Sequence, residues 1–195
     1  MKRHYLLSVL VFSALSVLSQ EQRDFFVKGV SRFTPEHSLT LWYDKPATLT
    51  DAENIWMEYS LPIGNGQLGA CLFGGIAKDE IQFNEKTLWT GGPNDMGSYG
   101  QYKNFGSVFV EDLSGGIGYT ADTCACDYVR YLDLETGVGG VDYKSATTKY
   151  SRRYLASYPD GAVVALYKSK GRKKLHLRVS MVAGDDLGVS ETIYD

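Results

Sequence analysis

A series of short strand-like runs, separated by turn signals at nearly regular spacing, most constrains how this chain folds. Between Leu39 and Met181, stretches of five to ten residues either alternate apolar and polar residues or are rich in β-branched and aromatic residues. Clusters of Gly, Pro, Asn and Asp lie between them, and helical periodicity is almost absent. This arrangement predicts an all-β fold, either a sandwich or a barrel.

The runs also predict which side chains face the core. In EIQFN (80–84), Ile81 and Phe83 are expected inside, and in TKYSRRYLAS (148–157) Tyr150 and Tyr154 share one face. The apolar run AVVALY (162–167) predicts a strand buried on both faces. Further strands are expected at 39–43, 105–113, 127–134 and 175–181, the last with Leu175, Leu177, Val179 and Met181 inside and His176, Arg178 and Ser180 outside.

The segment LPIGNGQLGACLFGG (61–75) contains the spacing G-x-G-x-x-G at Gly64, Gly66 and Gly69. A dinucleotide site needs a strand before these glycines and a helix after them, because the helix N-terminus holds the phosphates. Here Pro62 precedes the glycines, and ACLFGGI, which has strand character, follows them. The sequence therefore predicts no nucleotide site at this loop.

A structural reason for the glycines is expected instead. The pair Asn65-Gly66 favours a turn with positive φ. Gly69, Gly74 and Gly75 are expected to allow close approach of the backbone in a crowded β-layer.

The first residues have the pattern of a secretory signal peptide. Lys2 and Arg3 precede an apolar run from Leu6 to Leu18, and small residues allow cleavage between Ser19 and Gln20. The run is shorter than the roughly 20 apolar residues of a membrane-spanning helix. We expect a signal peptide at 1–19, a polar lead-in at 20–38 and a folded domain at 39–195, exported to the periplasm or the extracellular space without a membrane anchor.

Charge and cysteine content exclude several other functions. The net charge of −3 gives no broad basic surface for nucleic acid. Cys71, Cys124 and Cys126 are odd in number, lack metal-binding spacing and are interpreted as small apolar side chains. We predict no metal and no cofactor.

Four blocks of sequence, occurring in order, resemble the N-terminal domain of the family 95 glycoside hydrolases. That family consists mainly of α-L-fucosidases that act on α-1,2-linked fucose. The resemblance implies an antiparallel β-sandwich of the supersandwich type and runs from about Leu39 to Met181. The blocks are LWYDKPA (41–47), LPIGNGQLGACLFGGIAKDEIQFNEKTLWTGGPND (61–95), YLDLETGVGGVDY (131–143) and RRYLASYPDGAVVAL (152–166).

The resemblance also implies where catalysis takes place. Members of the family carry out an inverting reaction in an (α/α)6 helical barrel that lies far downstream of the sandwich, with a general-acid Glu in that barrel. None of these positions occurs here, and the chain ends at Asp195, inside the expected sandwich. We therefore expect an incomplete sandwich without catalytic residues: the N-terminal domain of an exported α-L-fucosidase-like enzyme, with the barrel of full-length relatives and fucosylated glycans as partners. A free-standing carbohydrate-binding module is the alternative.

The acidic residues of the chain agree with a non-catalytic role. Inversion usually needs two carboxyl groups about 6.5–9.5 Å apart. The available acids are expected in turns and on solvent faces, where they are solvated. They are Glu58, Asp79, Glu80, Glu85 and Asp95.

The block 61–95 is expected to include the surface that contacts the barrel. Its candidate residues for contact with substrate or the partner domain are Asn65, Asn84, Glu85, Trp89 and Asn94, because aromatic residues flanked by polar groups suit an interface. Asn65 is also expected to support its own turn, and Asn84 and Glu85 either cap the next bend or face the partner. Trp42, Trp56 and Trp89 are expected to be core or interface anchors rather than sugar platforms.

Overall fold

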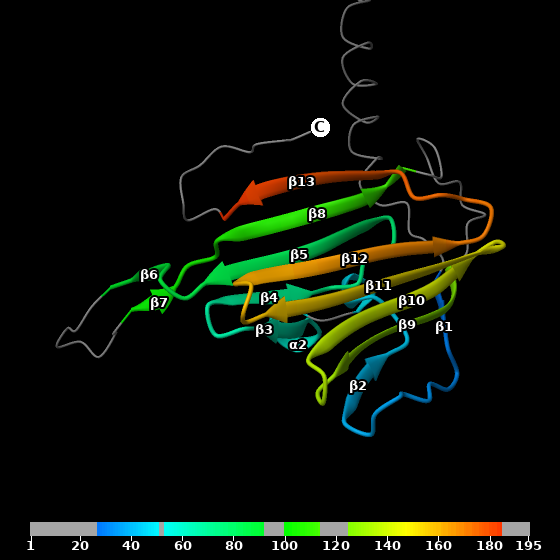
Figure 1. Ribbon diagram of the computed structural model, residues 1–195, viewed down its shortest axis with the longest axis horizontal. Coiled ribbons are helices and arrows are strands. Elements are labelled where there is room, and N and C mark those ends of the chain that lie inside the picture. Colours follow the sequence, from blue (N-terminus) through cyan, green and yellow to red (C-terminus); the bar gives the residue numbers. More distant parts are fainter. Residues whose placement is uncertain (1–26, 51–52, 92–99, 114–124, 185–195) are drawn as a thin grey trace, which may run out of the picture.

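The computed structural model describes residues 27–50, 53–91, 100–113 and 125–184. Within these residues strands predominate: two large sheets face each other, and β6 and β7 form a separate two-stranded sheet, so the fold is the expected all-β sandwich (Figure 1). The predicted signal peptide at 1–19 lies outside the described residues. The elements are β1 (Val27–Gly29), β2 (Thr40–Tyr43), η1 (Ala47–Leu49), α2 (Ile55–Glu58), β3 (Leu61–Gly64), β4 (Leu68–Leu72), β5 (Lys78–Glu85), β6 (Trp89–Thr90), β7 (Gln101–Tyr102), β8 (Gly106–Asp112), β9 (Ala125–Asp133), β10 (Val138–Ser145), β11 (Thr148–Ser157), β12 (Ala162–Lys170) and β13 (Leu177–Ala183).

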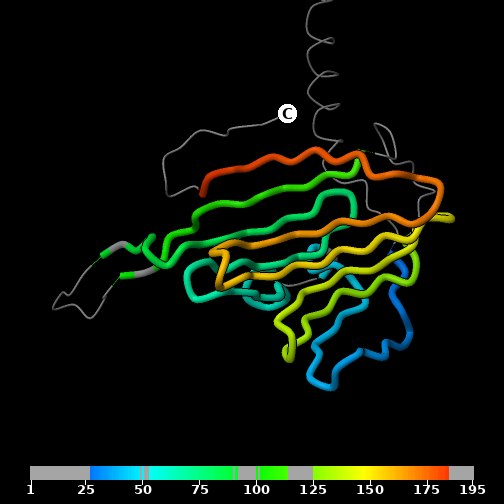
Figure 2. Tube along the Cα trace, viewed as in Figure 1, coloured from blue at the N-terminus to red at the C-terminus, as the bar shows by residue number. Residues whose placement is uncertain are grey.

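The two sheets have simple orders. The first, here sheet I, runs β1-β9-β10-β11-β12, and β2 also pairs with β9. The second, sheet II, runs β13-β8-β5-β4-β3. Pairing is antiparallel in both sheets except between β1 and β9, which are parallel. After β12 the chain crosses from sheet I to sheet II, where β13 lies beside β8 (Figure 2).

All seven expected strands are present. Five further strands among the described residues were not predicted: β1, β3, β6, β7 and, the longest of them, β10. The glycines of β10 suggested a turn, whereas they occupy the strand interior for steric reasons. A Cβ on Gly139 would lie 2.5 Å from Leu72, and one on Gly140 would lie 2.3 Å from the ring of Tyr131. Gly140 therefore lets the Tyr131 ring lie across β10, a role that glycine often has in strands.

The loop that carries Gly64, Gly66 and Gly69 is a β-hairpin turn between β3 and β4. Gly66 has a φ of +85°, and Asn65 Oδ1 accepts hydrogen bonds from the amides of Gln67 and Leu68 at 3.0 and 2.8 Å. A strand rather than a helix follows the turn, so the helix N-terminus that a dinucleotide needs is absent from this loop. The prediction of a structural turn is thus confirmed.

Two of the three glycines expected to allow close approach do so. A Cβ on Gly74, which has a φ of +72°, would lie 2.5 Å from the hydroxyl oxygen of Tyr128, and one on Gly75 would lie 2.1 Å from the carbonyl oxygen of Lys78. The prediction for Gly69 is wrong, because a Cβ there would meet nothing nearer than Ile63 O at 4.0 Å. Gly69 instead leaves open space on the outer face of β4.

The core lies between the inner faces of the two sheets. Ile81 and Tyr154 are buried as predicted, and Phe83 packs against the core. Stacked tyrosines fill much of sheet I's side: the rings of Tyr143 and Tyr150 are 4.9 Å apart at 10°. The buried apolar cluster is Leu61, Ile63, Ala70, Leu72, Ile76, Ile81, Ala125, Tyr128, Leu132, Val141, Tyr143, Tyr150 and Tyr154.

The burial expected for β12 and β13 is only partly correct. Val164 and Leu166 of β12 are 49% and 45% exposed, because β12 is the outermost described strand of sheet I and their face points away from sheet II. Val179 of β13, expected inside, is 49% exposed. It lies on the outermost described strand of sheet II, which sheet I covers little. An apolar run therefore predicted the strand but not its position in the sheet.

Asp79 was expected in a turn or on a solvent face, and this is wrong: it is 1% exposed in β5 and joins the two sheets. Its carboxylate accepts hydrogen bonds from the hydroxyls of Tyr154 at 2.5 Å and Tyr167 at 2.6 Å, and Arg152 Nη1 lies 3.4 Å away. Asp79 lies two residues before Ile81 and four before Phe83 in β5, so strand alternation predicts that it faces inward. Its charge suggested exposure instead.

Arg152 completes this cross-sheet network. Its guanidinium donates to the carbonyl oxygens of Gly75 and Ile76, the latter at 2.8 Å, and to the hydroxyl of Tyr143 at 3.3 Å. Burial by itself lowers the pKa of Arg152, but Asp79 outweighs it and holds that pKa well above its ordinary value. Both charges are thus paired and hydrogen-bonded, as buried ions must be.

Replacing Asp79 by Ala should destabilise the sandwich by about 3–5 kcal/mol, because Arg152 would remain buried without its counter-ion. Urea unfolding followed by circular dichroism measures the change. Asp142→Ala is the matched control, since its ion pair with Arg153 joins β10 and β11 on the outer face and should contribute about 1 kcal/mol or less. Equal losses in the two variants would contradict a structural role specific to Asp79.

Candidate functional site

A groove of about 320 Å³ lies at one end of sheet II. It is formed by the β3–β4 turn, the end of β5 and Tyr102 of β7. Asn84 of β5 pairs with Gly69 of β4, which in turn pairs with Gly64 of β3. The two strand positions next to Asn84 in the sheet therefore carry no side chain. The open space at Gly69 therefore makes the groove concave.

Asn65 lies beside this groove and has two structural tasks. Besides accepting hydrogen bonds within its turn, its Nδ2 donates to Ser157 O of β11 at 2.7 Å. The side chain thus ties the hairpin of sheet II to the end of a strand in sheet I. The expected turn-supporting role is confirmed.

Asn84 and Glu85 form the end of β5 and line the groove. Asn84 Oδ1 accepts from the amide of Glu85 at 2.9 Å, and Glu85 Oε2 accepts from the amide and the hydroxyl of Thr87, the amide at 2.9 Å. The hydrogen bond from the Thr87 side chain, followed by that from its amide, lowers the pKa of Glu85. Both residues hold the bend after β5, as one of the two expected roles requires, and they also border the groove; that they face a partner domain stays a prediction.

Trp89 extends the site onto the β6–β7 hairpin, which projects from the end of the sandwich (Figure 1). It pairs with Tyr102, and their rings meet edge to face with centroids 4.8 Å apart. Trp89 is 46% exposed and Tyr102 56%, so the sandwich core does not contain them. Asn94 lies outside the described residues. The structure thus brings Asn84 and Glu85 together, with Trp89 linked to them through Tyr102.

The other two tryptophans are separate from this groove. Trp42 of β2 is 38% exposed and packs against Phe33 with ring centroids 5.8 Å apart. Trp56 of α2 is 52% exposed. A core position, one of the two expected for the tryptophans, is therefore wrong for all three.

The acids considered for catalysis make local contacts. Glu58 Oε1 accepts from the amide of Asn54 at the start of α2 at 3.2 Å, and Glu80 Oε1 accepts from the hydroxyl of Ser107 at 2.7 Å. Asp79 and Glu85 have the partners described above, and Asp95 lies outside the described residues. Each of the four described acids therefore supports the fold around it.

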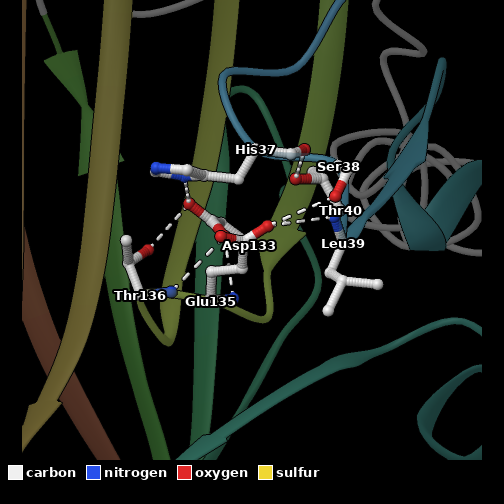
Figure 3. Close-up of polar contacts among 7 residues, drawn as sticks. All are labelled: His37, Ser38, Leu39, Thr40, Asp133, Glu135 and Thr136. Carbon is white, nitrogen blue, oxygen red and sulfur yellow. Dashed lines mark hydrogen bonds and ion pairs between the residues drawn. The ribbon is translucent and has the colours of Figure 1, made fainter.

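A second concave region, which no sequence pattern predicted, lies on the outer face of sheet I. It has a volume of about 480 Å³ and is bordered by the lead-in segment 33–40 and strands β9 to β11. Figure 3 shows His37 directed at Asp133, which also contacts Thr136; the ion pair from His37 Nδ1 is 2.6 Å long. These residues fasten the lead-in to the β9–β10 turn.

Aromatic stacking also holds the lead-in segment 33–40 against sheet I. Phe33 stacks on Tyr131 with ring centroids 5.4 Å apart at 27°, and the Tyr131 ring lies across Gly140. Arg153 lies 5.3 Å from that ring and pairs with Asp142. Phe33 thus already covers a face of Tyr131 that could otherwise stack on a sugar. The pattern LTLWY predicted β2, but the lead-in had no period that would indicate these contacts.

Within the described residues, His, Cys, Asp and Glu form no group of three that could hold a metal ion. In the same part of the chain, every helix is too short or too polar to cross a membrane. Cys71 and Cys126 are partly buried, and Cys124 lies outside the described residues.

Comparison with known proteins identifies the domain. The sequence matches the family model described as "Glycosyl hydrolase family 65, N-terminal domain" over residues 41–103 and 94–185. The chain belongs to this family. Its sandwich is therefore a glycoside hydrolase N-terminal domain, as the resemblance to such a domain predicted; the narrower assignment to family 95 stays a prediction.

Three curated relatives are much longer than the region they share with this chain. "Alpha-L-fucosidase 2" of Arabidopsis thaliana is 32% identical over 145 residues, which cover 57% of this chain and 17% of the relative. Proteins named "Probable alpha-fucosidase A" from Aspergillus niger and Aspergillus oryzae are 26% identical over 158 and 178 residues. Those matches cover 64% and 75% of this chain, and 19% and 23% of the relatives. The chain thus spans less than a quarter of the length of these relatives.

The His37–Asp133 pair should make stability depend on pH. The hydrogen bond to Asp133 raises the pKa of His37. A raised pKa in the folded state gives stabilisation that is complete below the unfolded value of about 6.5 and is lost as pH rises through the folded pKa.

His37→Gln should therefore lower the unfolding midpoint in urea more at about pH 5.5 than at about pH 8.5. Urea titrations of both proteins at the two pH values measure this difference. His176→Gln is the control, because His176 is exposed. A loss for His37→Gln that is the same at both pH values would contradict the assignment.

Proposed function

We propose that this chain is the N-terminal β-sandwich domain of an exported α-L-fucosidase-like glycoside hydrolase of family 95, and that its groove and β6–β7 hairpin contact the catalytic (α/α)6 barrel. Membership in a glycoside hydrolase N-terminal domain family supports the first part, together with relatives named as fucosidases. The ordered blocks between Leu41 and Leu166 support family 95. The leader-like residues 1–19 support export.

The observation that carries the contact surface is the exposed aromatic pair Trp89 and Tyr102. Large aromatic residues are enriched at the centres of interfaces, where a polar rim excludes water from them. Here the pair lies on a projecting hairpin, and the polar side chains Asn84 and Glu85 and the glycine turn lie next to it. Hydrogen bonds already fix both polar side chains, so docking would cost little further ordering.

Catalysis is assigned to the partner domain rather than to this sandwich. An inverting hydrolysis needs one carboxylic acid and one carboxylate on opposite sides of a glycosidic bond. In this domain Asp79 is committed to Arg152, and Glu58, Glu80 and Glu85 are committed to neighbouring amides and hydroxyls. The sandwich then supports and positions the barrel.

The isolated chain should not hydrolyse a chromogenic α-L-fucoside, because the proposed reaction takes place in the barrel. Release of the chromophore is followed with the purified chain, alongside a full-length enzyme that carries such a domain as the positive control. Turnover that follows the chain through successive purification steps would refute this division of labour.

Trp89→Ala should leave the stability of the isolated chain nearly unchanged but weaken domain docking in a full-length protein that contains this domain. Truncating a central interface anchor costs about 2 kcal/mol or more, whereas a core Trp→Ala change costs about 3–5 kcal/mol of folding stability. Thermal unfolding of the isolated chain and fucosidase activity of the full-length protein measure the two effects. Trp56→Ala, an equally exposed tryptophan on α2, is the control and should preserve both. A large loss of melting temperature for Trp89→Ala in the isolated chain would overturn the interface assignment.

The alternative, a free-standing carbohydrate-binding module, is separated from this proposal by calorimetry. Titration of the chain with fucosylated oligosaccharides should give no heat of binding if the domain acts through the barrel. Saturable binding by the isolated chain would favour the alternative instead.

A further inference from the structure

Three lysines lie side by side across sheet I, on its outer face. Lys144 of β10 is directly opposite Lys149 of β11, and Lys149 is directly opposite Lys170 of β12. Like charges in directly opposite positions on neighbouring strands are destabilising. The row therefore imposes an electrostatic cost on the sheet that a bound anion would relieve.

The surroundings of this row are concave and further enriched in positive charge. A pocket of about 650 Å³ is bordered by the three lysines and by Lys168, and Ser151 and Asp142 on the same face also contribute to its lining. Asp127 forms an ion pair with Lys144 and so offsets one of the charges. The segment that follows β12 adds Arg172, Lys173 and Lys174. The whole chain has a net charge of −3, so this cluster is a local exception.

The cluster is separate from the proposed barrel contact. Its lysines lie where β10 ends, β11 begins and β12 ends, at the opposite end of the sandwich from the β6–β7 hairpin (Figure 1). A ligand there would leave the groove beside Asn84 and Glu85 accessible.

We propose that this lysine cluster binds an anionic polysaccharide through its sulfate or carboxylate groups. Neighbouring strands are about 4.8 Å apart, so the three lysine stems cover about 10 Å, which suits charges carried on successive sugar rings. Ser151, which lies on the same face of β11 as Lys149, borders the same pocket, and its hydroxyl can contact the uncharged parts of a sugar. Nucleic acid is the competing polyanion, and its binding is one outcome of the test below.

Such binding would be a function of the sandwich itself, in addition to any contact with the barrel. The domain belongs to a glycoside hydrolase family, and a polysaccharide held at the lysine end would keep the enzyme on a charged glycan surface. The interaction does not depend on which sugar the barrel hydrolyses.

The test measures binding of the full chain to dextran sulfate and to polygalacturonate, with uncharged dextran and double-stranded DNA as comparison ligands. Calorimetry between about 0.01 and 0.15 M salt covers the range in which surface charges become screened. Dextran sulfate or polygalacturonate should bind with an affinity that falls as salt rises, and dextran should not bind. No binding of either anionic polymer at the lowest salt, equal binding of dextran, or tighter binding of DNA would overturn the proposal.

A double variant, Lys149→Gln with Lys170→Gln, should weaken the binding by about fivefold for each lysine removed. Its melting temperature at low salt should stay the same or rise, because the change removes like-charge repulsion. The control is Lys45→Gln with Arg178→Gln, which makes the same change in net charge at exposed positions outside the cluster. Equal weakening by the control would show a general charge effect and overturn the proposed site.

Discussion

The buried ion pair between Asp79 and Arg152 is the constraint on which the sandwich depends most directly. Two paired sheets can slide over an apolar interface with little directional preference, since hydrophobic burial is non-directional. The carboxylate of β5 removes that freedom, because it needs the hydroxyls of Tyr154 and Tyr167 and the guanidinium of Arg152 at fixed positions in sheet I. The register of the sheets then places the Asn65 turn against Ser157, and thereby places the groove.

The buried ion pair lies apart from the two proposed contact surfaces. The polar groups that the core requires face inward, whereas the groups that border the groove and the lysine cluster lie at the two ends of the molecule (Figure 1). The exposed side chains of Lys149, Lys170 and Trp89 make no contact with Asp79 or Arg152, so substitutions at these three positions leave that ion pair in place. The exposed pair Trp89 and Tyr102 fits this pattern, since it projects on a short hairpin whose described residues are not members of the buried cluster.

Local sequence patterns predicted most of the long strands. The features that they did not predict depend on contacts with residues distant in sequence. Alternation placed Ile81 and Phe83 inside, yet the same alternation placed Asp79 there, and only the presence of Arg152 in another sheet makes that burial tolerable. The glycines of β10 indicated a turn because the Tyr131 ring that needs Gly140 comes from β9. Exposure of Val164 and Leu166 depends on the order of strands in the sheet, which no local run encodes. The lysine row was missed for the same reason, since its members are opposite one another only after β10, β11 and β12 pair.

The parallel pairing of β1 with β9 has a consequence for the order of folding. The strands of sheet II up to β8, together with β1 and β2, emerge from the ribosome before β9 does. The hairpin of β3 and β4 and its neighbour β5 can pair as soon as they are synthesised, because their contacts are local. The lead-in strands must wait for β9, and contacts that close such long loops form slowly. The nascent chain therefore holds its earliest strands unpaired until the middle of the domain has been made.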